Sequence, residues 1–277
     1  MRAWAVYRAI VVPLAVLGAP GSALAMCFEA DHSQVAIYPT ADLLPENLLR
    51  MYVYFPRPMG ADEGLRSVRL LGEQGVPING VFLAGREDLW SSDRRRLTLV
   101  FDPGRVKTGL AAHQSMGRAL APGRSYTLDV SGAALDATGC PLGADTRFGF
   151  TVVDADYDPP DPAAWEIAAP AANSTEPVVV TLGSAHDHVS LAFRLRVLDV
   201  DGAVVPGKIV LGDGEESWEF APRAPWAATT YTLSIDERLE DLAGNRPGVP
   251  FDRPLRQAPR AWIGTRTFTP QPTAGEP

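Results

Sequence analysis

The segments "YTLDVSGAALDATG" (Tyr126–Gly139) and "YTLSIDERLEDLAG" (Tyr231–Gly244) are two versions of one pattern. In each, an aspartate follows the tyrosine by ten residues and a glycine follows it by thirteen. The spacing between the copies is roughly 100 residues, the length of one ordinary small domain. The repeat therefore predicts two similar domains in tandem.

A second pair of matching segments shows where the copies differ. Phe101-Asp-Pro precedes the first tyrosine by 25 residues, whereas Phe220-Ala-Pro precedes the second by 11. The first copy therefore carries a 14-residue insertion within Gly104–Leu120, near 104–120.

Apolar and polar residues alternate with a period of two in several short runs, which is typical of half-buried strands. Glycine and proline, 25 of each in 277 residues, favour many turns between short strands. We predict an all-β fold made of two tandem Ig-like β-sandwich domains. The alternating apolar positions are Leu49, Met51, Val53, Phe55; Leu97, Leu99, Phe101; Tyr126, Leu128, Val130; Leu191, Phe193, Leu195, Val197; and Tyr231, Leu233, Ile235.

The amino terminus has the composition of a secretory signal peptide. Arg2 and Arg8 give a positive start, Ile10–Ala19 is apolar, and small residues precede Ala25. The apolar run is shorter than the roughly 20 residues of a membrane-spanning helix. We expect residues 1–25 to be removed on export to the periplasm or the cell surface, and we expect no transmembrane segment in the mature chain.

The two cysteines, Cys27 and Cys140, leave three states open. In an oxidising compartment they can form one disulfide. Alternatively, the sequence "LAMC" places Cys27 where a bacterial lipid anchor attaches, although Met26 fits that signal poorly. The third state is two unpaired thiols.

Composition shifts mark the domain boundaries. "DYDPPDP", residues 156–162, is acidic and rich in proline, and its restricted backbone predicts a short stiff linker. It separates a first domain, 26–155, from a second, 163–252. We assign residues 253–277, which are rich in proline and lack periodicity, to a C-terminal tail.

The order of these motifs resembles bacterial Ig-like domains of the S-layer (SbsA) type. The resemblance covers most of both domains and is clearer in the first, where Phe55-Pro-Arg-Pro58-Met59 and Phe148-Gly-Phe150-Thr151 match the first and last elements. In the second domain Gly183–His186 replaces the Pro-Met element, and the closing strand is hard to find. The resemblance implies a sandwich module on an exported envelope protein, with no catalytic residue to carry over.

The repeated residues have structural roles that explain their spacing. A tyrosine that begins an inner strand can bond its hydroxyl to a nearby loop, as in a tyrosine corner. An aspartate three residues before a glycine can accept backbone N–H groups in a turn in which the glycine has a positive φ. Glu240 aligns with Leu135 and is not repeated, so we interpret "LEDLAGN" as a turn rather than an acidic site. The structural motif is Tyr126, Asp136, Gly139, Tyr231, Asp241 and Gly244.

Two sets of residues are candidates for binding. Trp90 can stack on a sugar ring, and the insertion carries Arg105, Lys107 and His113. Loops on a rigid sandwich often carry binding residues, although a loop that only packs over the end of the domain fits the same sequence. The chain can therefore be a carbohydrate- or peptide-binding envelope protein.

"HDH", residues 186–188, is the densest cluster of metal-ligand types. In an extended segment His186 and His188 share a face and can chelate a metal, which would suit a metal-dependent hydrolase. The alternative is a solvated loop in the position of the Pro-Met element.

The remaining patterns argue against catalysis and nucleic acids. No nucleophile elbow, phosphate loop or paired metal-ligand motif occurs, and the net charge of −8 disfavours nucleic acid. We expect a non-catalytic structural or interaction module without a cofactor, whose partner is a protein or glycan of the cell envelope.

Overall fold

The structure is a computed structural model that describes residue 27 and residues 34–85, 88–107, 114, 117–252 and 260–272. From Gln34 onward these residues belong to one compact unit. Residues 1–25, the expected signal peptide, and His113 lie outside the described residues. Within the described residues, no helix has the length and apolar character needed to cross a membrane.

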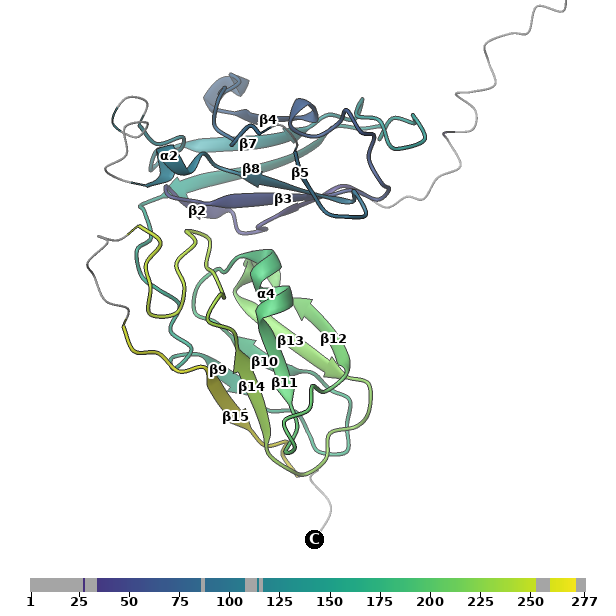
Figure 1. Ribbon diagram of the computed structural model, residues 1–277, viewed down its shortest axis with the longest axis vertical. Helices are drawn as coiled ribbons and strands as arrows, with labels where there is room; N and C mark the ends of the chain where they lie inside the picture. Colours follow the sequence, from purple (N-terminus) through teal and green to yellow (C-terminus); the bar gives the residue numbers. More distant parts are fainter. Residues whose placement is uncertain are drawn as a thin grey trace, which may run out of the picture. The chain divides into compact units, whose positions relative to one another are not determined.

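The first copy consists of two four-stranded sheets (Figure 1). One sheet has the order β1-β3-β6-β5, and all its pairs are antiparallel. The other has the order β2-β8-β7-β4, in which only β2 runs parallel to its neighbour. The strands are β1 Ala36–Tyr38, β2 Leu43–Pro45, β3 Arg50–Tyr54, β4 Val68–Leu71, β5 Leu89–Trp90, β6 Arg96–Val100, β7 Ser125–Val130 and β8 Thr146–Val153.

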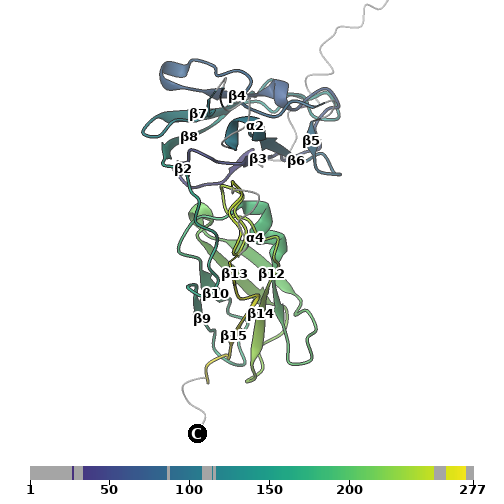
Figure 2. The ribbon, with the colours of Figure 1, turned by 60° about the vertical axis from the view of Figure 1, so that its left-hand side comes forward.

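The second copy repeats this topology in two sheets, β12-β13-β10-β9 and β11-β14-β15 (Figure 2). β14 pairs with β11 and β15 as β7 pairs with β4 and β8, and the strand that corresponds to β2 is missing among the described residues. The strands are β9 Glu166–Ala168, β10 Val178–Thr181, β11 Leu195–Leu198, β12 Gly207–Leu211, β13 Ser217–Pro222, β14 Tyr231–Ile235 and β15 Thr265–Phe268.

Each copy has its own apolar core between its two sheets. Met51 and Leu97 of one sheet pack with Leu128 and Phe150 of the other in the first copy. In the second copy Trp218 of one sheet packs in a separate cluster with Leu233 of the other. Alternating side chains from both sheets fill each core, as a sandwich requires. The predicted all-β class with tandem β-sandwich domains is confirmed.

Short helices connect the strands, and one of them corrects a prediction. The alternation Leu191, Phe193, Leu195, Val197 predicted one strand, but α4 occupies His188–Arg194 and β11 begins only at Leu195. The helix begins here because the Asp187 side chain accepts a hydrogen bond from the Ser190 amide at 2.8 Å, which caps its first turn. The other helices of the described residues are α2 Pro103–Val106 and the 3-10 turns η1 Leu65–Ser67, η2 Glu73–Gly75 and η3 Asp213–Glu215.

The assigned C-terminal tail contains the closing strand of the second domain. β15 pairs with β14 over Tyr231↔Phe268 to Ser234↔Thr265. The Phe268 ring is buried in the second core, stacked on Tyr231 with ring centroids 5.7 Å apart. The boundary at residue 252 is therefore too early. Composition obscured it because the strand is short and lies between prolines.

Candidate functional site

Both repeated tyrosines form the same corner. The Tyr126 hydroxyl accepts a hydrogen bond from the Ala121 amide at 3.0 Å, and the Tyr231 hydroxyl accepts one from the Ala227 amide at 3.0 Å. Each ring is buried at the start of an inner strand, so the bond pins the preceding loop to the core. This corner is a feature of Ig-like sandwiches.

Both repeated aspartates form the same turn. Asp136 Oδ1 accepts the amides of Thr138 and Cys140 at 2.8 and 2.9 Å. Asp241 Oδ1 accepts the amides of Ala243 and Asn245, both at 2.9 Å. Gly139 and Gly244 have φ values of 82° and 81°, which favour glycine. The turn is therefore reproduced in detail by both copies.

The two turns shift the pKa of their aspartates in opposite directions. The Arg57 guanidinium lies 3.1 Å from Asp136. Burial alone would raise the pKa of Asp136, but the Thr138 and Cys140 hydrogen bonds and Arg57 outweigh it and hold the pKa below its usual range. Burial raises the pKa of Asp241 to about 8, and the nearby Asp156 carboxylate adds to this. The second turn is therefore more deeply buried than the first.

The second turn is buried because it packs on the first domain. The Leu242 side chain belongs to the apolar cluster of the first domain, and the Leu242 carbonyl accepts the Leu49 amide at 2.9 Å. A Cβ atom on Gly244 would lie 2.5 Å from a methyl group of Leu49, so the backbone approaches closely there. This turn is a docking element between domains, a role its first copy does not share.

Glu240, which aligns with Leu135 and so has no acidic counterpart in the first copy, forms the ionic part of this contact. Its carboxylate accepts Arg50 Nη2 of β3 at 2.6 Å. Its other oxygen accepts Arg246 Nε and Nη2 at 2.9 and 2.7 Å, a paired geometry that strengthens the interaction. The interpretation of this stretch as only a turn was therefore incomplete.

Beside it lies a buried hydrogen bond between the domains. The Tyr52 hydroxyl donates to the Asp187 carboxylate, at 2.8 Å from Oδ2 and 3.0 Å from Oδ1. Burial raises the pKa of Asp187, whereas Arg50, with Nε at 3.8 Å, lowers it. Burial, together with the Asp187 carboxylate, also raises the pKa of Tyr52. The raised pKa of Tyr52 keeps the proton on the tyrosine oxygen, which donates it to the Asp187 carboxylate.

A third group of contacts surrounds Glu215, which is 1% exposed. Its carboxylate accepts the Thr40 amide at 2.7 Å and faces His188 Nδ1 at 3.0 Å. The Tyr38 ring stacks on the His188 ring with centroids 3.6 Å apart.

The linker is also tied to both domains. The Asp156 carbonyl accepts hydrogen bonds from the side-chain amides of Asn47 at 2.6 Å and Asn245 at 3.3 Å.

We call this set of contacts the joint. Its residues are Tyr38, Thr40, Asn47, Leu49, Arg50 and Tyr52 of the first domain; Asp156 of the linker; and Asp187, His188, Glu215, Glu240, Leu242 and Asn245 of the second domain.

The histidines of "HDH" do not form a metal site with other described residues. His186 is 1% exposed and packs edge-on to the Trp165 ring, 5.7 Å between centroids. His186 forms an antiparallel bridge with Asp241, as Met59 does with Asp136 in the first copy. His186 therefore occupies the position that Met59 has in the first copy. Burial lowers the pKa of His186 to about 4. The expectation that residues 186–188 form a solvated loop is wrong, because the joint and the second core cover this segment.

The candidate binding residues of the first domain are separated in space and largely engaged. Trp90 packs on Phe55, with centroids 5.4 Å apart, and Arg94 lies 5.3 Å above its ring. Arg105 donates to the carbonyls of Gly117 and Arg118, both at 3.0 Å. Lys107 Nζ lies 4.2 Å from the centre of the Phe251 ring. These interactions favour a packing role for the start of the insertion.

Trp90 nevertheless lines a surface hollow of about 660 Å³ together with Asp62, Glu63 and Asp88. An aromatic ring beside carboxylates is a common composition of sugar sites. Because Arg94 covers one face of the indole, that face is closed to a stacked sugar.

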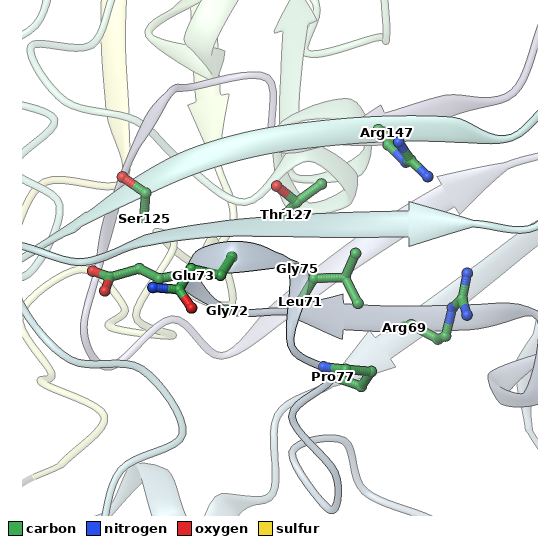
Figure 3. Close-up of a pocket in the computed structure, with 10 residues that line it drawn as sticks. Arg69, Leu71, Gly72, Glu73, Gly75, Pro77, Ser125, Thr127 and Arg147 are labelled. Carbon is green, nitrogen blue, oxygen red and sulfur yellow. The ribbon is translucent and has the colours of Figure 1, made fainter.

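A second hollow of about 540 Å³ lies along β7 (Figure 3). Arg69 and Arg147 lie toward one end of it, and Ser125 and Glu73 toward the other (Figure 3). Both arginines bond the fully buried Asp129, at 2.6 and 2.8 Å. Although burial raises the pKa of Asp129, the two guanidiniums outweigh it and hold the pKa below its usual range. The two arginines therefore neutralise the buried Asp129 carboxylate and hold it in place on this sheet.

The cysteines are both disulfide-bonded, and they are the chain's two cysteines. A thioether to lipid at Cys27 would require the same sulfur, so the bond is incompatible with a lipid anchor there.

Sequence reasoning missed the joint, although a signal was present. Arg50, Tyr52 and Tyr54 form the face of β3 opposite its alternating apolar residues, which a half-buried strand leaves to solvent, but Tyr52 is only 3% exposed. An aromatic-rich polar face and an acid that departs from the repeat were the available indications of a covered surface.

No protein-family model matches the sequence, and a comparison with curated proteins returns no match. Among solved structures, a three-domain segment of native alpha-2-macroglobulin from Escherichia coli is 13% identical, with a TM-score of 0.28; the alignment covers 88% of this chain and 74% of that one. The titin Ig tandem domains A164-A165 are 10% identical, with a TM-score of 0.23 over 83% and 89%. Murine CEACAM1b is 10% identical, with a TM-score of 0.18 over 73% and 91%. At these scores the likenesses carry no functional argument.

Proposed function

We propose that the chain is a non-catalytic, exported envelope protein in which two Ig-like domains act as one rigid structural or interaction module. The observation that carries this proposal is Leu242, a residue of the second domain whose side chain belongs to the first domain's core. Domains that are joined only by a flexible linker do not share a core. The proposed membership of the S-layer type of bacterial Ig-like domain rests on the motif order and gives the module its place at the envelope.

The polar contacts of the joint support rigidity because they depend strongly on geometry. Asp187, Glu215 and Glu240 are all buried, and each bonds a group of the first domain. Breaking any one of these bonds while its carboxylate stays buried would leave a buried charge without its partner, which costs several kcal/mol. A small rotation would break the same bonds, so one arrangement is favoured over its neighbours.

The shifted pKa values of three side chains are explained by their burial at or beside the joint. Asp187, Asp241 and His186 owe their shifted pKa values chiefly to burial at or beside the joint. Clusters of shifted groups often mark active sites, but ion-pair networks also produce them. Their burial at or beside the joint supports a non-catalytic role.

Export is supported by two features. The first 25 residues have the pattern of a cleaved leader, and the two cysteines are disulfide-bonded. Intact mass measurement of protein recovered from the periplasm or medium tests this. A mass lacking residues 1–25 and two hydrogens is expected, and a mass carrying added lipid or the leader contradicts it.

The rigid-module proposal is tested by Leu242→Asp. The charge would enter the first domain's core, and we expect dissociation of the joint at a cost of about 3 kcal/mol or more. Small-angle X-ray scattering should then show a larger radius of gyration. The matched control is Ala137→Asp, because Ala137 is the exposed residue at the same position of the first turn. Unchanged scattering of the folded Leu242→Asp protein contradicts the proposal.

A further inference from the structure

The joint borders a surface groove whose charge is opposite to that of the protein. Six arginines line this groove of about 690 Å³, although the chain carries a net charge of −8. We call it the arginine groove. Arg50 and Arg96 come from the first domain, whereas Arg194, Arg196, Arg238 and Arg246 come from the second.

The carboxylates at the groove do not balance these arginines. Glu240 bonds Arg50 and Arg246. Asp236 bonds Arg194 at 3.3 Å and Arg238 at 2.8 Å, and Asp187 is the third acid. Glu237 also acts on Arg238, so six guanidiniums face four carboxylates, which leaves an excess of two positive charges, since arginine stays protonated.

The excess is concentrated on two arginines that have no ion-pair partner among the described residues. Within the part of the chain that the structure describes, the Arg196 side chain bonds only the carbonyl of Leu195, at 2.7 Å. Arg96 lies 5.9 Å from the centre of the Tyr52 ring, and its Nε is buried without a hydrogen-bond partner among the described residues. Such an unsatisfied donor is costly unless another group bonds it.

The accessible arginines are held in place, which prepares them for a ligand. Arg238 and Arg246 keep about half their side-chain surface exposed, 58% and 49%, while each bonds its carboxylate through two nitrogens. Phe193 of α4, 57% exposed, adds an apolar surface to the groove. Fixed guanidinium forks lose little entropy when they bind an oxyanion.

We infer that the arginine groove binds a multiply charged phosphate-bearing anion. A phosphate group carries up to two negative charges and three acceptor oxygens, so several guanidiniums can share it. A single carboxylate would neutralise only one of the two excess charges. Because both domains contribute arginines, this inference rests on the joint of the proposed function, and a bound anion would bridge the domains.

The test is isothermal titration calorimetry of the disulfide-bonded chain without its leader, with sodium tripolyphosphate as the probe, at about 0.1 M salt, where the screening length is about 10 Å. We expect Arg196→Gln and Arg96→Gln each to weaken binding about tenfold, as the loss of a charged hydrogen bond predicts. Arg95→Gln is the matched control, because Arg95 is the exposed neighbour of Arg96 and does not line the groove.

Each outcome decides the inference. Absence of binding, or equal weakening by Arg95→Gln, overturns it, because the latter indicates general charge attraction. Tighter binding of polyglutamate than of tripolyphosphate also overturns it. Arg196 makes no contact in the joint, so its variant remains informative if Arg96→Gln does not fold.

Two further measurements separate the sources of phosphate and the two proposals. Sedimentation with phosphatidylcholine vesicles that contain phosphatidylglycerol, if it depends on Arg196, assigns a lipid headgroup; tripolyphosphate binding without sedimentation assigns a soluble or polymeric phosphate. Scattering of the unmutated chain shows whether the joint is intact. An intact joint without binding refutes the groove alone, whereas separated domains refute the proposed function.

Discussion

The Tyr52 hydroxyl of β3 donates a hydrogen bond of 2.8 Å to the Asp187 carboxylate, and the two residues are 3% exposed. They lie 135 positions apart in the chain and belong to different domains. One bond thus joins the face of a strand in the first domain to the cap of a helix in the second.

Tyr52→Phe removes this donor and leaves a buried acid short of one partner. We expect the free energy of unfolding to fall by about 1–3 kcal/mol, measured by urea denaturation. Tyr54→Phe is the control on the same strand face; its ring contacts Tyr38, and its hydroxyl bonds no other described residue. Its effect should stay within about 0.5 kcal/mol. Equal effects of the two changes would argue against the Tyr52–Asp187 bond.

Glu240→Gln removes the charge shared by Arg50 and Arg246. We expect a loss of about 1–2 kcal/mol, which is less than a fully buried pair would give because the two arginines are 26% and 49% exposed. Added salt should reduce the difference between the variant and the unmutated chain. Glu237→Gln, at an exposed position nearby, should change stability by less than about 0.5 kcal/mol. A salt-independent loss would contradict an ionic contribution.

His186→Met tests the buried histidine by giving it the residue of the matching first-domain position. Burial lowers the pKa of His186 from 6.5 to about 4. The folded state therefore resists protonation, and the unmutated chain should lose about 3 kcal/mol relative to the variant as pH falls from 6.5 through 4. Urea denaturation at several pH values measures this difference. A constant difference would show that the pKa of His186 is the same in the folded and unfolded states.

Asp241→Asn and Asp136→Asn should have opposite pH dependences although their turns match. Burial raises the pKa of Asp241 to about 8, so the unmutated chain should lose stability relative to Asp241→Asn as pH rises from about 4 to 8, by about 1 kcal/mol or more. The pKa of Asp136 is lowered instead, so its advantage over asparagine should be lost as pH falls below about 4. Parallel pH profiles would contradict the different surroundings of the turns.

The strands that frame each core could be predicted from sequence because one face of each is apolar. The alternation at β6, β7 and β14 predicted their positions, and the repeated aspartate and glycine indicated the turns. α4 was missed because the Asp187 cap begins a helix inside an alternating run. Local preference for a cap here prevails over a period-two pattern.

The joint could not be predicted in the same way. The bond between Arg50 and Glu240 spans 190 positions, and no local pattern states which surface covers the second face of a strand. The repeat even hid the role of Glu240, since alignment to Leu135 made it an unmatched residue. Glu240 departs from the repeat because its copy of the turn contacts the other domain, whereas the first copy of the turn does not.

The central claim is that the two domains move as one body, and ¹⁵N NMR relaxation of the disulfide-bonded chain tests it most directly. Amides of β6 and β7 report on the first domain, and those of β13 and β14 on the second. We predict one rotational correlation time for both sets, that of the whole chain, and two shorter values in Leu242→Asp. Two separate correlation times in the unmutated chain would contradict the account.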